Sequence, residues 1–141
     1  MNTNKFLTGG VVAGVLYFGL GYLVWGVLLS DFMAECAGTA TGVMKAQTEF
    51  VWWALIAGNL FSGFALSYVL NKASAFSAGA GAVTGAAISL LISAGYDFTM
   101  FGVSNINTLN GALVDIAAST VVGAVIGSIT GAILGMGKKA A

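Results

Sequence analysis

The chain has 141 residues, enough for one domain, with five Lys, five Asp or Glu and a formal net charge of zero. Charged residues make up 7% of the chain and hydrophobic residues 58%, whereas a soluble domain carries about 25% charged residues. A soluble protein needs charged side chains over its surface. This composition therefore excludes a soluble protein and indicates an integral protein of the lipid bilayer. Disorder and nucleic-acid binding are excluded as well, since the chain is apolar and lacks a basic surface.

Four apolar segments are long enough to cross a membrane as helices, because a bilayer core of about 30 Å requires about 20 residues at 1.5 Å each. They are residues 6–29, 50–70, 76–95 and 111–136, the third ending at about Gly95 or slightly beyond. Their continuous apolar character differs from the alternation expected in the strands of a membrane β-barrel. The sequence therefore predicts an all-α membrane protein, with a single four-helix transmembrane domain over residues 1–141.

The connection at residues 30–49 is the longest one, and it is predicted to lie on the outer side of the membrane. Met33, Ala37, Ala40 and Met44 follow helical spacing, which favours a helix on the membrane surface. The glycines and threonines among residues 38–42 favour an irregular loop instead. The sequence leaves both alternatives open.

The lysines predict the orientation of the helices. Four crossings put both termini on one side, which then collects four of the five lysines, Lys5, Lys72, Lys138 and Lys139. The opposite side has one, Lys45. Cytoplasmic segments carry the excess of Lys and Arg, so both termini are expected in the cytoplasm, with the protein in the inner membrane. Three tryptophans agree with this orientation, since they fall near the outer helix ends, where indole rings prefer to lie: Trp25, Trp52 and Trp53.

Glycine is unusually frequent, with 21 residues in the chain, roughly twice the usual share of about 7%. In the third and fourth spans the glycines recur every four residues, at Gly81, Gly85, Gly123, Gly127, Gly131 and Gly135. Small residues at this spacing let helix backbones approach closely, which is how helices associate in lipid. The sequence predicts that these glycine stripes pack the four helices of one chain. The alternative is that one stripe joins copies in a homo-oligomer, or joins another subunit of a membrane complex.

Asp97 and Asp115 are the ionisable residues predicted within the apolar zone, where a carboxylate costs about 2.5–3.5 kcal/mol at the bilayer centre. If the third helix stops at Gly95 in a left-handed cap, both carboxyl groups lie at a similar outer depth. Two carboxylates at one depth form a candidate site for a cation or a shared proton. Alternatively, each Asp hydrogen-bonds backbone donors or caps a helix.

Asparagines are the other polar candidates. Asn105 follows Asp97 in the connection before the last span, and with Asn107 and Asn110 it is expected to complete a polar plug around the carboxyl groups. Asn59 lies midway along the second span, where an amide is expected to hydrogen-bond a neighbouring helix.

The sequence contains few of the residue types that catalysis usually requires. The chain has no His and no Arg, and Cys36 is its only cysteine, so no intramolecular disulfide is possible. A catalytic triad, a His or Cys metal cluster and a phosphate clamp all need residue types that are missing. We therefore expect neither an enzyme nor a bound metal or cofactor.

A short motif begins at the end of the third predicted span and continues into the fourth. Tyr96-Asp97-Phe98-Thr99 is followed by Asn105 and Asn107, and then by Val114-Asp115-Ile116 at the start of the glycine-spaced helix. Over residues 96–141 this resembles uncharacterised small bacterial membrane proteins with four predicted spans, of the domain-of-unknown-function type. Met100 departs from that pattern by standing where an Asn is expected. The resemblance implies a four-span fold and a membrane location, without an activity.

Two functions fit these observations. The glycine stripes and the lack of reactive residues favour a non-enzymatic membrane protein that self-associates or joins a larger complex. The alternative is a small cation or proton channel or transporter that uses Asp97 and Asp115.

Overall fold

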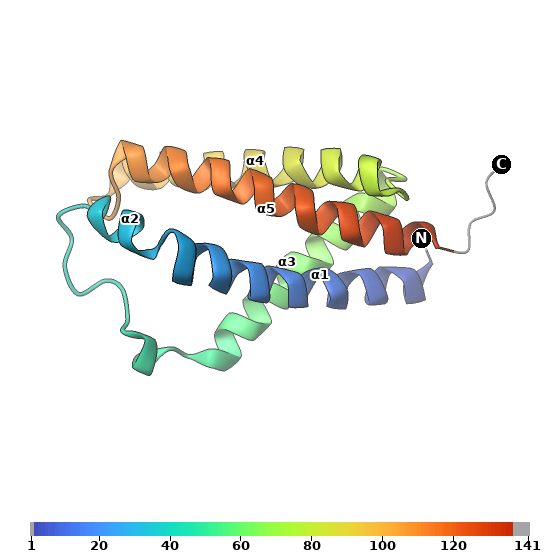
Figure 1. The fold of residues 1–141 in the computed structure, drawn as a ribbon, viewed down its shortest axis with the longest axis horizontal. Helices are drawn as coiled ribbons and strands as arrows, with labels where there is room; N and C mark the ends of the chain where they lie inside the picture. The colour runs from blue at the N-terminus through green and yellow to red at the C-terminus, as the bar shows by residue number, and fades with distance from the viewer. Residues whose placement is uncertain (1, 137–141) are drawn as a thin grey trace.

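The computed structural model describes residues 2–136 as a bundle of long helices (Figure 1). In chain order the helices are α1 (Thr3–Leu23), η1 (Val24–Leu28), α2 (Ser30–Glu35), η2 (Gln47–Glu49), α3 (Trp52–Lys72), α4 (Ala78–Val103) and α5 (Leu109–Gly135). Within this described part, four helices are long and apolar enough to cross a membrane: α1 continued by η1, α3, α4 and α5. By the length and composition of its helices, the chain is a multi-pass membrane protein.

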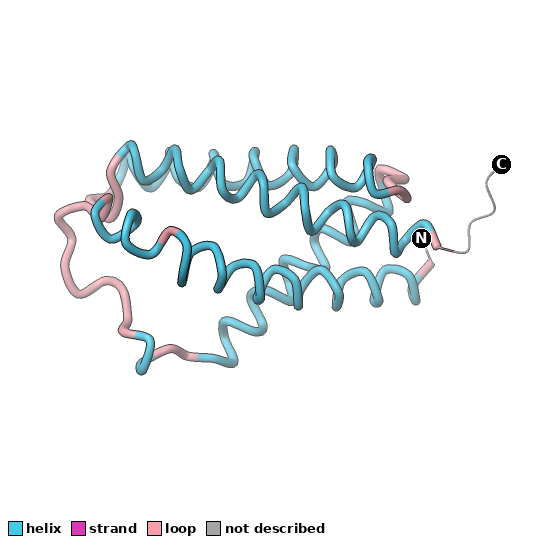
Figure 2. Tube along the Cα trace, viewed as in Figure 1, coloured by secondary structure: helices cyan, strands magenta, loops and turns pink. Residues whose placement is uncertain are grey.

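The connections lie at the two ends of the bundle (Figure 2). The terminal end carries both ends of the described chain and the turn between α3 and α4, and the opposite loop end carries α2, the long connection and the α4–α5 turn (Figure 1). Three of the long helices begin after a capping side chain that accepts a backbone hydrogen bond from the first turn. The accepting side chains are those of Asn2 (from Lys5 N, 3.2 Å), Ser77 (from Ala80 N, 3.2 Å) and Thr108 (from Gly111 N, 3.3 Å).

The third spanning helix is longer than the sequence predicts, because α4 continues through Gly95 to Val103. The expected left-handed stop at Gly95 is therefore wrong. A glycine inside a helix costs only about 1 kcal/mol relative to alanine, and the apolar residues that follow it favour a longer span. α4 ends at Ser104, whose backbone is extended (φ −141°, ψ 166°) and whose hydroxyl donates to the Met100 carbonyl at 2.6 Å. The other three spans begin and end within a few residues of the expected ranges.

The long connection is neither a continuous surface helix nor wholly irregular. Helix α2 stops at Glu35, and the chain then pairs with the α4–α5 turn: Gly38 N donates to Ile106 O at 2.9 Å and Ala40 N to Asn105 O at 3.0 Å. A Cβ at position 38 would overlap the Asn105 carbonyl, so this pairing requires glycine. These bonds hold the connection against the loop end of α4 and α5.

Helices α4 and α5 lie against each other along glycines of both. A Cβ at Gly85 would come within 2.9 Å of the Gly127 Cα, and a Cβ at Gly131 within 2.9 Å of the Gly81 Cα. The same kind of contact joins α1 to α3, where a Cβ at Gly63 would come within 2.7 Å of the Gly14 Cα. Real Cβ atoms do not approach this closely, so a larger residue would push the helices apart.

The long helices form two closely packed pairs, α4 with α5 and α1 with α3, which α1 and α5 join together. Helix α3 contacts α4 and α5 sparsely and runs obliquely across the bundle, so that its N-terminal half diverges from the other helices (Figure 1). The buried apolar core lies from the middle of the bundle toward the terminal end and consists of Ala13, Leu66, Leu70, Ala75, Val122, Ile126 and Leu134. The half toward the loop end has three further buried apolar residues, Cys36, Ala112 and Ile116, and it contains a cavity.

Lys5 connects the two ends of the described chain by hydrogen bonds. Its ammonium group donates to the carbonyl oxygens of Leu134 and Met136, each at 2.9 Å. The last carbonyls of a helix have no partner within the helix, and a cation near them is favoured by the helix dipole. The start of α1 and the end of α5 therefore lie on the same side. Lys138 and Lys139, which the sequence-based orientation also uses, are outside the described residues.

Candidate functional site

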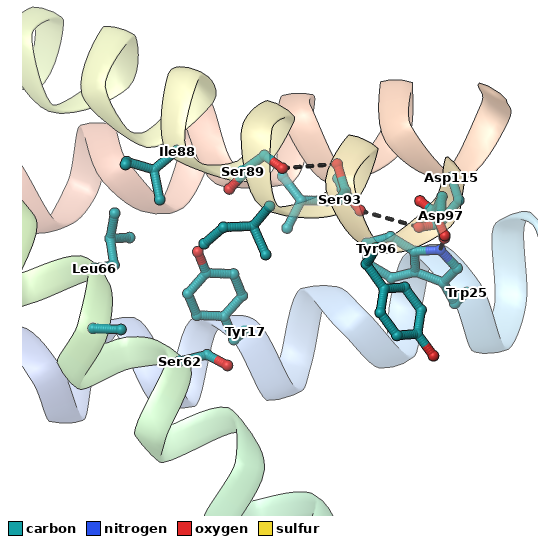
Figure 3. A pocket seen from close by; sticks show the side chains of 14 residues that line it. Tyr17, Trp25, Ser62, Leu66, Ile88, Ser89, Ser93, Tyr96, Asp97 and Asp115 are labelled. Atoms are coloured by element: carbon teal, nitrogen blue, oxygen red, sulfur yellow. Dashed lines mark hydrogen bonds between the residues drawn. The ribbon is translucent and has the colours of Figure 1, made fainter. Parts of the chain in front are cut away.

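Asp97 and Asp115 come together on the antiparallel pair of helices α4 and α5. Asp97 lies six residues before the end of α4 and Asp115 six residues after the start of α5, which puts both about 9 Å from the loop end at 1.5 Å per residue. Both side chains line the same cavity, where they lie next to each other (Figure 3). The similar depth expected from the sequence is correct, although the helix continues past Gly95 rather than stopping there.

The Asp115 carboxylate has two hydrogen-bond donors (Figure 3). The indole Nε1 of Trp25 donates to Asp115 Oδ1 at 2.5 Å, and the Ser119 hydroxyl lies 3.5 Å from Asp115 Oδ2. Trp25 is part of η1, a π-helical turn in which Leu29 N donates to Val24 O at 2.7 Å. Such turns are frequent at functional sites, since the extra residue redirects side chains. Here the turn carries the indole that donates to Asp115.

The Asp97 carboxyl group lacks such partners. Its side chain is buried, with 7% of its surface exposed, and its Oδ2 atom has no hydrogen-bond donor among residues 2–136. The neighbouring Asp115 carboxylate is itself an acceptor, so two ionised groups cannot satisfy each other. A proton held between the oxygens, or a cation beside them, removes this conflict.

The carboxyl pair lies at one end of a cavity of about 320 Å³ bounded by α1, α3, α4 and α5 (Figure 3). The cavity walls are mostly apolar, with a few hydroxyl groups on α4. Ser93 donates its hydroxyl to the Ser89 carbonyl at 2.7 Å, which leaves the lone pairs of that oxygen free to accept a bond or to bind a cation. Tyr17 lies farther along the cavity and, like Ser89, lines its wall (Figure 3).

The two asparagine candidates lie outside this site. Asn59 donates its amide to the Leu55 carbonyl of the same helix at 2.8 Å, rather than to a neighbouring helix as expected. Asn105 is in the α4–α5 turn, where its carbonyl accepts from Ala40 N, and it does not line the cavity. The expected polar plug of asparagines therefore does not surround the carboxyl groups.

Several residues of the site were not singled out by the sequence. The sequence predicts Trp25 as an anchor at the membrane interface, and only the folded chain shows that its indole donates a hydrogen bond to Asp115. A weaker signal is present, since Ser89, Ser93 and Asp97 are four residues apart and therefore share one helix face. Asp115 and Ser119 repeat the same spacing on α5.

In the part of the chain that the structure describes, no group of three or more His, Cys, Asp or Glu residues could hold a metal ion. Two carboxyl groups, an indole N–H and hydroxyl groups suit a proton or a singly charged cation. The chain matches no known protein-family model, no curated protein and no solved structure.

Proposed function

We propose that this chain is a small non-enzymatic membrane transporter that binds a proton or a cation between Asp97 and Asp115. One observation carries the proposal: the buried Asp97 carboxyl group, 7% exposed and without a donor for its Oδ2 atom within residues 2–136, lies beside a second carboxyl group. Ionisable residues within spanning helices are costly, and those that are kept mark ion or proton pathways. A structural role would be served by a neutral side chain.

The geometry favours a binding site over an open pore. The cavity beside the carboxyl pair ends where the bundle core begins, and Leu66, Leu70, Ile126 and Leu134 of that core are each 2% exposed or less. A path across the membrane then requires the two helix pairs to move relative to each other. The sparse contacts of α3 with α4 and α5 permit such a movement.

Self-association or membership of a larger complex has less support as the main role. The glycines that the sequence offers for an interface between copies lie instead against backbone of the same chain, as at Gly81, Gly85, Gly127 and Gly131. These stripes are therefore already occupied by the neighbouring helix and need no second copy.

For the orientation, we propose both termini in the cytoplasm and the loop end on the outer side of a bacterial inner membrane. Lys5 and Lys72 lie at the terminal end and Lys45 in the connection at the loop end, which agrees with the positive-inside rule. A green fluorescent protein fused to either end is expected to fluoresce, and alkaline phosphatase inserted near Lys45 is expected to be active. Termini found on opposite faces would contradict this orientation.

The transport proposal is tested by flux in liposomes. We expect the purified protein to carry protons or Na⁺ down an imposed gradient, measured with a pH-sensitive or Na⁺-sensitive dye inside the vesicles. Asp97→Asn and Asp115→Asn are each expected to reduce the flux about tenfold or more, since each removes one of the two charges that attract the cation.

Asp31→Asn is the matched control, because Asp31 is an exposed acid of α2 outside the cavity. It is expected to keep the flux of the unsubstituted protein. Flux no higher than in empty vesicles, or equal flux in Asp97→Asn and Asp31→Asn, rejects transport at this site.

A further inference from the structure

The cavity beside Asp97 and Asp115 is larger and more apolar than a bare ion requires. Its volume of about 320 Å³ falls within the range of small-molecule sites, about 300–1,000 Å³. Metal cations such as Ca²⁺ take six or more oxygen ligands, whereas the oxygens here gather at one end of the cavity. The rest of the wall includes Leu66, Ile88 and Ile92, which offer nothing to an inorganic ion.

Aromatic rings line the same cavity. Tyr17 and Trp25 from the first spanning helix and Tyr96 from α4 all contribute to its wall. Figure 3 places Trp25 and Tyr96 at the end that holds the carboxyl pair and Tyr17 farther along. Aromatic faces attract organic cations, and the attraction grows when the cation is removed from water.

From the exposure of its wall, we expect the cavity to be open to lipid on the side between α3 and α4. Helices α3 and α4 contact each other sparsely, and the wall residues on this side are exposed, with Tyr96 at 65% and Ile92 at 65%. At the loop end the connection is held across α4 and α5 by the bonds from Gly38 and Ala40. A ligand dissolved in the bilayer can therefore enter between α3 and α4.

From these observations we propose that the ligand of this site is a lipophilic organic cation: an amine or quaternary ammonium group attached to an apolar body. The cationic group binds between Asp97 and Asp115, beside Trp25 and Tyr96, and the apolar body lies along Ile88 and Leu66. The inference rests on the proposed function, because it uses the same carboxyl pair and names the class of cation. The buried, unpartnered Asp97 carboxyl in the cavity wall is the observation that points to a ligand.

The test is equilibrium binding of radiolabelled benzyltrimethylammonium to the full chain in detergent. We expect saturable binding that unlabelled benzyltrimethylammonium displaces. Neopentylbenzene, the neutral molecule of the same shape with carbon in place of nitrogen, is not expected to displace it. Asp97→Asn is expected to weaken binding about tenfold or more, since it removes one charge of the pair. Asp31→Asn, which changes an exposed acid outside the cavity, is expected to bind as the unsubstituted chain does.

A second variant covers the case in which Asp97→Asn does not fold. Tyr96 is 65% exposed, so its replacement is expected to leave the fold intact. Tyr96→Leu is expected to weaken binding of the quaternary ammonium about threefold, whereas Tyr96→Phe keeps the ring and is expected to retain it. Binding that the neutral molecule displaces equally, or binding unchanged in both Asp97→Asn and Tyr96→Leu, overturns the inference.

The inference and the proposed function can fail separately. If the protein carries protons or Na⁺ in an Asp97-dependent way but does not bind benzyltrimethylammonium, the organic-cation site is rejected and cation transport stands. If it binds benzyltrimethylammonium in an Asp97-dependent way but carries no ion in vesicles, the organic-cation site stands and ion transport is rejected.

Discussion

Gly127→Leu is expected to destabilise the bundle more than any other single substitution proposed for it. A Cβ at this position would overlap the Gly81 carbonyl oxygen and come within 2.9 Å of the Gly85 Cα. Excess volume in a close-packed region costs about 1–3 kcal/mol where neighbouring side chains can move. Here the obstructing atoms are backbone, so α4 and α5 must separate, and we expect a loss of about 3 kcal/mol or more. Thermal unfolding in detergent, followed by circular dichroism, measures the loss.

Gly58→Leu is the matched control. Gly58 is also inside a spanning helix, but within the described residues nothing lies within 4 Å of a Cβ built there. Leucine favours helix by about 1 kcal/mol relative to glycine, so this variant is expected to unfold at the same temperature as the unsubstituted chain or slightly higher. Equal unfolding temperatures for Gly127→Leu and Gly58→Leu would contradict the close contact between α4 and α5.

Asp97→Asn is expected to stabilise the protein while it weakens cation binding about tenfold or more. The Asp97 side chain is 7% exposed, and the structure supplies no donor for Oδ2 from residues 2–136. Leaving a buried polar group unpaired costs about 1–3 kcal/mol, and more when the group is charged. The amide of asparagine can donate to Asp115, so the conflict between the two acceptors disappears. We expect a gain of about 1–3 kcal/mol at neutral pH in the absence of ligand, measured by thermal unfolding.

Asp31→Asn again serves as the comparison, because an exposed surface substitution changes stability by about 0.5 kcal/mol or less. A destabilised Asp97→Asn would mean that the carboxyl group contributes to the fold, and the functional interpretation of the site would lose its main support. If Asp97 serves function at the expense of stability, its replacement by Asn is expected to raise stability and to lower binding.

The helical spans follow from local properties of the sequence. Apolar length, capping residues such as Ser77 and Thr108, and helical spacing of glycines each act within one segment, so they can be recognised without the rest of the chain. The sequence predicts the end of α4 too early, because glycine is a common residue at helix ends and Gly95 indicates one. The apolar residues after Gly95 favour the helix instead, and it continues to Val103. For the site, the sequence predicted both carboxyl residues and their similar depth.

The composition of the sequence and the lengths of its apolar segments alone determined the four membrane-spanning helices. Each apolar segment can be buried in lipid whichever helices lie next to it. Which helices pair was decided only by the tertiary structure, since a glycine stripe specifies a close approach but not the helix that makes it. The same holds for the contact between Asp97 and Asp115, and for the π-turn that directs Trp25 to Asp115. Contacts between residues far apart in the chain depend on the relative rotation and depth of whole helices, which no single segment encodes.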